Sequence, residues 1–164
     1  MHAATKPNNT MLRKTIISLI TALCATTQAP AQHAIGQWQV YNSFTTAATS
    51  LIDTKKMVYL VNDKNLYAFD KDGEELISYN KNTGLSEMSI SEIYRNYDRD
   101  YIVAAYSNAN IDVVYDDGRI VNMSEIKDAQ NVTTKNINDI AFDGDVMYVA
   151  TGFGLVKYNM DSHS

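Results

Sequence analysis

The sequence contains one cysteine and three histidines, and all four lie near its ends. They are Cys24, His2, His33 and His163, so residues 34–162 contain neither residue type. This absence excludes Ser-His-Asp and Cys-His catalysis, zinc sites built on those ligands, and disulfides from that stretch. No glycine-rich loop is followed by Lys and then Ser or Thr, which excludes a phosphate-binding loop of that kind.

Proline is also scarce, and the composition is that of a folded chain. Two prolines occur in 164 residues, and hydrophobic residues make up 45%. These values argue against disorder, and the length allows one domain at most. All 19 acidic residues follow residue 31, whereas three of the 14 basic residues precede it, which leaves a net charge of −8 on the remainder. Such a surface is poorly suited to binding nucleic acid or anionic lipid head groups.

The first 31 residues have the pattern of a secretory signal peptide. Arg13-Lys14 supplies the positive region, residues 15–25 supply the apolar region, and Ala29-Pro30-Ala31 supplies small residues before a cleavage site. The apolar run is too short, and too often interrupted by Thr, for a stable transmembrane helix. We therefore expect export and no transmembrane span in the mature chain, with translation starting at Met1 or Met11.

A repeat of about 45 residues organises the rest of the chain. Its clearest copy, residues 137–159, consists of three short apolar segments separated by turns at Asp143-Gly144-Asp145 and Gly152-Phe153-Gly154. Equivalent aliphatic positions recur at Leu66, Ile111 and Leu155. This period, with about four short strands per copy, is typical of a β-propeller blade. The 3.6-residue periodicity of helical repeats is absent.

The repeat predicts two complete four-stranded blades and a third that ends after three strands. The predicted strands are 47–52, 57–61, 66–70 and 76–79, then 90–94, 101–106, 111–115 and 120–121, then 137–142, 146–150 and 155–158. The run 146–150 is almost wholly apolar, which predicts a strand buried on both faces. Residues 123–135 form a longer polar connection.

We therefore predict an all-β fold: a partial β-propeller of about two and a half antiparallel blades, and a fragment of a larger propeller because a closed ring needs at least four. The expected domains are a signal peptide, 1–31, and an N-terminal portion of a propeller, 32–164. The segment Trp38–Tyr41 is a short alternating strand that either packs in the core or closes the last blade.

Carboxylates and tyrosines are the remaining candidates for a site. Asp70-Lys71-Asp72-Gly73 resembles the start of a calcium loop, but the final Glu of such a loop is absent, which favours a hairpin turn. Four tyrosines could stack on a sugar or on a partner, although blade packing is the simpler interpretation: Tyr94, Tyr97, Tyr101 and Tyr106. The sequence predicts no catalytic residue, no cofactor-binding residue and no metal site.

Several phrases of the sequence resemble a known family. Asn82-Thr83-Gly84-Leu85-Ser86-Glu87, followed by Ile90 and Ile93, is similar to the repeat of two-component regulator propellers. The phrases 35–41, 105–112 and 150–156 are more specific, and together they resemble the N-terminal β-propeller of the PorZ family. That family belongs to the type IX secretion system of Bacteroidota. The resemblance extends from Ile35 to Asn159.

The resemblance implies a non-enzymatic component of the periplasm or the outer-membrane surface. Proteins of this family have two propellers and a C-terminal β-sandwich, and they work with the PorU sortase, which joins cargo to anionic lipopolysaccharide. The sequence lacks the second propeller and the sandwich. PorU is therefore the expected partner, lipopolysaccharide is expected only through the missing parts, and nucleic acid is not expected. Two alternatives are a periplasmic ligand-sensing propeller of a two-component regulator and, less favoured, a glycan-active enzyme.

Overall fold

The computed structural model describes residues 46–163. The predicted signal peptide and the segment Trp38–Tyr41 lie outside the described residues. Within 46–163, no helix has the length and apolar character needed to cross a membrane.

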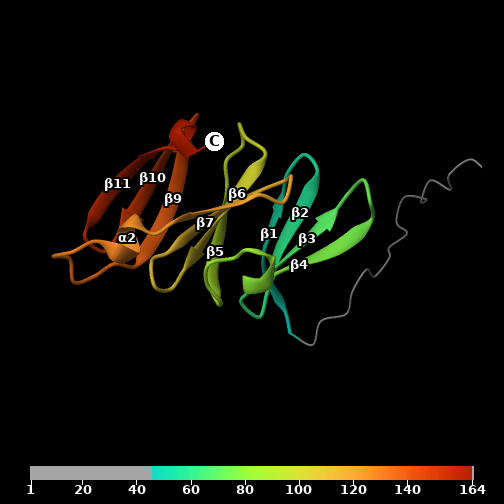
Figure 1. Cartoon of the computed structure of the whole chain (residues 1–164), viewed down its shortest axis with the longest axis horizontal. Coiled ribbons are helices and arrows are strands. Elements are labelled where there is room, and N and C mark those ends of the chain that lie inside the picture. The colour runs from blue at the N-terminus through green and yellow to red at the C-terminus, as the bar shows by residue number, and fades with distance from the viewer. Residues whose placement is uncertain (1–45, 164) are drawn as a thin grey trace, which may run out of the picture. The chain divides into compact units, whose positions relative to one another are not determined.

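Three antiparallel sheets follow one another along the chain (Figure 1). Sheet 1 contains β1 (Ala48–Asp53), β2 (Met57–Asn62), β3 (Asn65–Asp70) and β4 (Glu75–Tyr79). Sheet 2 contains β5 (Ile90–Arg95), β6 (Tyr101–Tyr106), β7 (Ile111–Tyr115) and β8 (Ile120–Met123). Sheet 3 contains β9 (Ile137–Asp143), β10 (Val146–Thr151) and β11 (Gly154–Asn159). Each strand pairs with the next one in sequence, so each sheet is a meander and corresponds to one predicted blade.

The prediction of a partial β-propeller is confirmed, and the predicted strands agree with the observed ones except at their ends. Short helical turns were not predicted. They are η1 (Lys81–Thr83) before sheet 2, α2 (Glu125–Asp128) between sheets 2 and 3, and η2 (Met160–His163) after β11. Because residues 123–135 are mostly polar, the sequence did not predict α2, whose one buried residue is Ile126.

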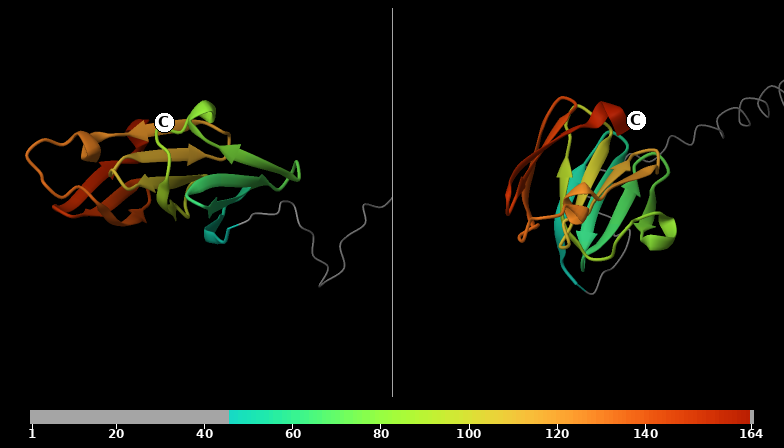
Figure 2. Two further views of the ribbon diagram at one scale, coloured as in Figure 1. Left: turned by 90° about the horizontal axis from the view of Figure 1, so that it is seen from below. Right: turned by 60° about the vertical axis from the view of Figure 1, so that its left-hand side comes forward.

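Apolar side chains fill the spaces between adjacent sheets. A first core lies between sheets 1 and 2 and includes Tyr59, Leu66, Ile93 and Ile102. A second core lies between sheets 2 and 3 and includes Ile111, Ile140 and other buried residues. The left view of Figure 2 shows sheet 2 between the other two. Sheet 2 is therefore packed on both faces, and every residue of β6 is buried.

The strand β10 corrects one expectation. Residues 146–150 were expected to be buried on both faces, but Met147 and Val149 are buried while Val146, Tyr148 and Ala150 are half-buried. Side chains alternate along a strand, so one face of β10 contacts sheet 2 and the other contacts no further sheet of the described chain. Burial on both faces, which was expected for β10, is found instead in β6, because β6 has a sheet on each side.

The first strand of every sheet has an irregularity at the same place. The pairing shifts by one residue at Thr49 in β1, at Ser91 in β5 and at Asn138 in β9. An extra residue of this kind is a β-bulge, which bends the strand and increases its twist. The recurrence shows that the sheets repeat in backbone detail, so residues can be compared position by position.

Candidate functional site

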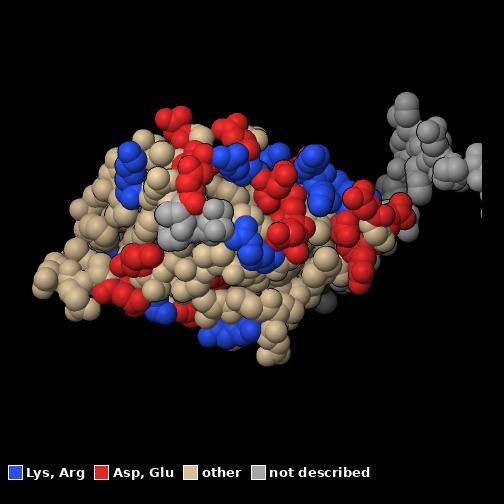
Figure 3. All heavy atoms as spheres, turned by 45° about the horizontal axis from the view of Figure 1, so that its top comes forward, with Lys and Arg blue, Asp and Glu red and all other residues tan. Residues whose placement is uncertain are grey.

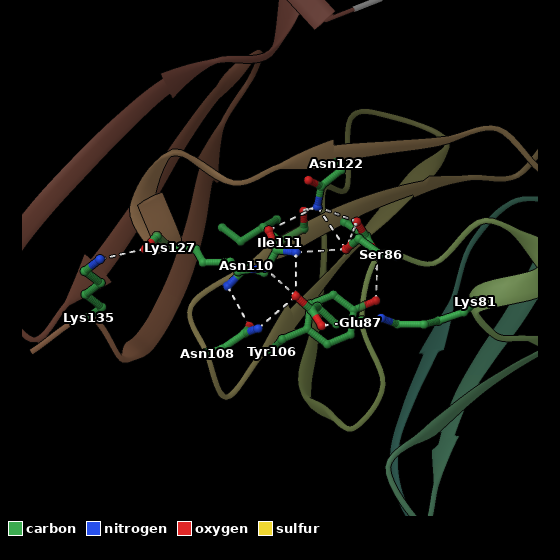
Figure 4. Close-up of polar contacts among 11 residues, drawn as sticks. Lys81, Ser86, Glu87, Tyr106, Asn108, Asn110, Ile111, Asn122, Lys127 and Lys135 are labelled. Atoms are coloured by element: carbon green, nitrogen blue, oxygen red, sulfur yellow. Dashed lines mark hydrogen bonds and ion pairs between the residues drawn. The ribbon is translucent and has the colours of Figure 1, made fainter. Parts of the chain in front are cut away.

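The turns and connections lie at two opposite ends of the strands. We call one the hairpin end, which contains the turns β1–β2, β3–β4, β5–β6, β7–β8 and β9–β10. The other is the connection end, which contains the turns β2–β3, β6–β7 and β10–β11 and the connections 80–89 and 124–136. The densest set of polar contacts lies at the connection end of sheet 2, and we call it the connection cluster. Figure 4 shows it.

Asp112 is the buried carboxylate of the connection cluster. It lies on β7, and its side chain is 0% exposed. Its oxygens accept hydrogen bonds from the Ser86 backbone N–H at 2.8 Å, the Ser86 hydroxyl at 2.7 Å, the Tyr106 hydroxyl at 2.6 Å and Asn122 Nδ2 at 2.9 Å. Burial, and then the hydrogen bond to Asp112, raise the pKa of Tyr106. Asp112 therefore holds the connection 80–89 against sheet 2.

Glu87 joins the two connections. Its Oε1 accepts hydrogen bonds from Lys127 Nζ of α2 at 2.6 Å and from Asn108 Nδ2 of the β6–β7 turn at 2.9 Å. Lys81 Nζ lies 3.8 Å from Glu87 Oε2. The hydrogen bond from Lys127, followed by the one from Asn108, lowers the pKa of Glu87. Lys135 Nζ donates to the Lys127 carbonyl at 2.6 Å, so the chain of contacts extends along the second connection (Figure 4).

A second buried carboxylate joins sheets 1 and 2 at the hairpin end. Asp116 of the β7–β8 turn is 5% exposed. It accepts hydrogen bonds from the hydroxyl of Thr54, in the β1–β2 turn, at 2.9 and 2.8 Å, and from the hydroxyl of Tyr59, on β2, at 3.1 Å. Asn96 has the corresponding role between sheets 2 and 3, because its Nδ2 donates to the Gly144 carbonyl at 2.9 Å.

These buried polar groups form a scaffold. Each oxygen of Asp112 accepts two hydrogen bonds, and the oxygens of Asp116 are shared among three donors, the Thr54 and Tyr59 hydroxyls and the Lys56 N–H, so both carboxylates are occupied by protein groups. Within residues 46–163, no group of three His, Cys, Asp or Glu side chains is arranged to hold a metal ion. The arrangement fixes the positions of neighbouring sheets.

The four tyrosines singled out from the sequence do not form a common platform. Tyr94 and Tyr101 pack in the second core, and Tyr106 is buried in the first. Tyr97 lies on the β5–β6 turn, is 81% exposed, and has the Arg95 guanidinium 4.7 Å from its ring centre. Blade packing therefore accounts for three of the four.

The predicted turn at Asp70–Gly73 is the β3–β4 hairpin. The Asp72 N–H donates to Asp70 Oδ1 at 2.9 Å, which is a local turn contact.

Sequence reasoning missed the residues that matter most to the scaffold: Asp112, Asp116 and Asn96. A signal for Asp112 existed, because it interrupts the otherwise apolar strand Ile111–Tyr115. Asp116 gave no comparable signal, since Asp116-Asp117-Gly118 is an ordinary turn sequence whose burial depends on contact with sheet 1.

Charge is divided unevenly between the two ends of the strands. The hairpin end, counted with the adjoining strand residues, has twelve acidic side chains: Asp53, Asp70, Asp72, Glu74, Glu75, Asp98, Asp100, Asp116, Asp117, Asp143, Asp145 and Asp161. Its six basic side chains are Lys55, Lys56, Lys71, Arg95, Arg99 and Arg119. The connection end has five acidic side chains, Asp63, Glu87, Asp112, Glu125 and Asp128, and four basic ones, Lys64, Lys81, Lys127 and Lys135. Figure 3 shows one face of the molecule, on which acidic and basic side chains lie close together.

Comparison with known proteins places the chain in a family. Residues 58–164 match the model of the PorZ N-terminal β-propeller domain, described as part of the type IX secretion system. The structure is also similar to that of PorZ from Porphyromonas gingivalis, described as an essential bacterial surface component of that system, with 28% sequence identity and a TM-score of 0.64. The similarity covers 71% of this chain and 16% of that one. No curated protein matches.

The family match spans more than half of the chain, and the three repeating sheets are the fold that it describes. The chain therefore belongs to the family of PorZ N-terminal β-propeller domains.

Proposed function

We propose that this chain is a non-enzymatic propeller component of a type IX secretion system. The family match over residues 58–164 is the observation that carries the proposal. The nature of the buried polar groups supports a structural role, because Asp112 and Asp116 are committed to hydrogen bonds that fasten sheets and connections together. Chemistry on a substrate would require reactive groups that are free to change partners.

The proposal includes export and a partner. Residues 1–31 act as a signal peptide, and the mature chain lies in the periplasm or at the outer-membrane surface. There it supports the PorU sortase, which attaches cargo to anionic lipopolysaccharide. Sequence determination of the mature N-terminus tests the first part: a start at Gln32 supports it, and retention of residues 1–31 contradicts it.

Deletion of the gene in the bacterium that encodes this chain tests the secretion role. We expect cargo proteins to lose their surface attachment and to accumulate unprocessed, as measured by immunoblots of cell fractions. Copies of the gene with intact sequence should restore attachment, and so should a copy with Asp117→Asn, an exposed position. Unchanged cargo attachment in the deletion strain would contradict the secretion role.

Co-purification tests the partner. The chain, carrying a tag, should retain PorU from a detergent extract of the same cells, and an untagged strain serves as the control. Absence of PorU from the retained proteins, with normal expression of both, would contradict this partner while leaving the secretion role to the deletion experiment.

A further inference from the structure

Sheet 2 is the described sheet that already has a neighbour on each face (Figure 2). Further sheets before sheet 1 or after sheet 3 would extend the row sideways. They would not cover the turns at the ends of the strands of sheet 2, because those turns lie beyond both cores. The side chains that these turns expose are therefore informative about binding, whatever the number of sheets in the propeller.

The β5–β6 turn of sheet 2 is longer than its equivalents. It has five residues, 96–100, whereas the β1–β2 turn has three, 54–56, and the β9–β10 turn has two, 144–145. In repeat proteins, residues inserted into one repeat form loops on one face, and this is often the face that binds a partner. The extra length therefore indicates a binding element at the hairpin end.

The β5–β6 turn is fixed by contacts with the rest of the fold. Asn96 is 0% exposed; its Nδ2 donates to the Gly144 carbonyl at 2.9 Å, and its Oδ1 accepts from the Asp98 N–H at 2.9 Å. Arg99 Nε donates to Asp145 Oδ1 at 2.6 Å, which joins the turn to the β9–β10 turn of sheet 3. A surface that is fixed before binding loses little conformational entropy when a partner binds.

Tyr97 is the exposed aromatic residue of this turn. Its exposed fraction of 81% is the largest among the large apolar and aromatic side chains of residues 46–163. The Arg95 guanidinium lies 4.7 Å from the ring centre, and most of the ring remains open to solvent. Exposed tyrosines supply contact area to interfaces, and their ring faces attract cations. Blade packing, which accounts for the other three tyrosines singled out from the sequence, does not account for Tyr97.

A hollow beside the β5–β6 turn is predominantly acidic. Its volume is about 230 Å³, and it is lined by Tyr115, by the carboxylates of Asp100, Asp116 and Asp117, and by Lys56. The carboxylate of Asp116 is occupied by hydrogen bonds within the fold, whereas Asp100 and Asp117 are exposed. The hairpin end around the hollow has six basic and twelve acidic side chains, a net charge of −6. An aromatic ring beside unneutralised carboxylates fits a cationic partner.

We propose that the β5–β6 turn and this hollow bind a positively charged, arginine-containing segment of a separate protein. One guanidinium stacks on Tyr97, and a second basic side chain pairs with Asp100 or Asp117. Arginine suits both contacts better than lysine, because the planar guanidinium stacks on rings and pairs with carboxylates through two hydrogen bonds. Lys56 opposes the attraction, so binding should be modest and should weaken as salt is added. The proposal does not depend on the secretion role.

Fluorescence anisotropy with the full chain tests the proposal. The probe is a fluorescein-labelled peptide of alternating arginine and serine, which should bind at low salt. The same peptide with lysine should bind more weakly, and the one with glutamate should not bind. Tyr97→Ser should weaken binding about tenfold and Asp100→Asn about threefold. Both side chains are exposed, so circular dichroism should show an unchanged fold.

Two matched variants separate a site from diffuse attraction to an acidic surface. Asp72→Asn makes the same change of charge on the β3–β4 turn, and Met88→Ser removes an exposed apolar side chain at the connection end. Both should bind the arginine peptide like the unaltered chain. Failure of the unaltered chain to bind this peptide would overturn the proposal. Equal weakening by Asp72→Asn and Asp100→Asn, or undiminished binding by Tyr97→Ser, would show diffuse attraction and would also overturn it.

Discussion

At the scale of single residues, the buried carboxylate of Asp116 joins sheet 2 to sheet 1 through hydrogen bonds from Thr54 and Tyr59. Replacing it with Asn removes one acceptor oxygen and the charge while preserving shape, and it leaves Thr54 or Tyr59 without a full partner. We expect Asp116→Asn to lower the free energy of unfolding by about 2–3 kcal/mol. Urea denaturation followed by circular dichroism measures this. Asp117→Asn, at the neighbouring exposed position, should change it by less than about 0.5 kcal/mol. Equal midpoints for the two variants would contradict the role of Asp116.

Tyr158 offers the opposite case, a buried polar atom without a partner. Its hydroxyl is buried and has no hydrogen-bond partner among the described residues. We expect Tyr158→Phe to leave the free energy of unfolding unchanged or to increase it by up to about 1 kcal/mol, because a donor no longer has to be desolvated. A loss of more than about 1 kcal/mol in urea denaturation would show that the hydroxyl has a partner.

Tyr158 should also influence stability at high pH. Burial, with a smaller effect of Glu125, raises the pKa of Tyr158 to about 12 from the ordinary 10.0. Its contribution to stability is complete below pH 10 and is lost as the pH rises toward 12, because the unfolded chain loses that proton first. Thermal melts in this range should therefore fall less steeply for Tyr158→Phe than for the unaltered chain. Parallel curves would contradict the burial of the hydroxyl.

Glu87 should influence stability at low pH. Its pKa is below the ordinary value of 4.5, so the unfolded chain binds the proton more readily than the folded chain. The contribution of Glu87 is present above about pH 4.5 and is lost as the pH falls through the lower folded value. We expect Glu87→Gln to flatten the decline in melting temperature below pH 4.5, with Glu75→Gln as an exposed control. An identical decline in Glu87→Gln would mean that its contact with Lys127 adds nothing to stability.

At the scale of elements, the connection into sheet 3 packs directly on the β10–β11 turn. The Gly152 N–H donates to the Asn136 carbonyl at 3.0 Å, and a Cβ at Gly152 would lie too close to Asn136 Oδ1 and Thr134 Cγ2. We expect Gly152→Ala to lower the free energy of unfolding by about 1–3 kcal/mol because the connection must move. Gly73→Ala is the control, since its nearest neighbour is the Asp70 side chain at 3.1 Å. A smaller effect at Gly152 than at Gly73 would contradict this packing.

The elements also show which parts of the fold the sequence could predict. Strand positions were predictable because apolar residues recur at the same places in each repeat, as at Leu66, Ile111 and Leu155. The bulges at Thr49, Ser91 and Asn138 were not, since they are defects in pairing between two strands and have no local signature. The connection cluster escaped prediction for a related reason: Glu87, Asn108 and Lys127 come together only when three separate segments pack.

At the scale of the whole molecule, the described sheets are alike in backbone and differ in what covers them. Burial of β6 on both faces, against the alternation in β10, follows from the number of neighbouring sheets. An apolar strand face is suited to be covered by a neighbouring sheet, but its hydrophobicity does not show that such a sheet is present. The expectation that 146–150 is buried on both faces was therefore wrong. Leu155 occupies the position of the buried Leu66 and Ile111 in the repeat and yet is exposed, so it identifies the uncovered face of sheet 3 better than the apolar run does.

The uneven distribution of charge between the two ends gives the propeller segment an electric dipole along its strands. The hairpin end, with six basic and twelve acidic side chains, has a net charge of −6, and the connection end, with four basic and five acidic ones, has a net charge of −1. A strand of six residues is about 20 Å long, which exceeds the Debye length of about 8 Å in physiological salt. Near a negatively charged surface, only the closer end therefore experiences the field. The resulting torque turns the acidic turns away from that surface and presents the connections, including Glu87 and Lys127, toward it.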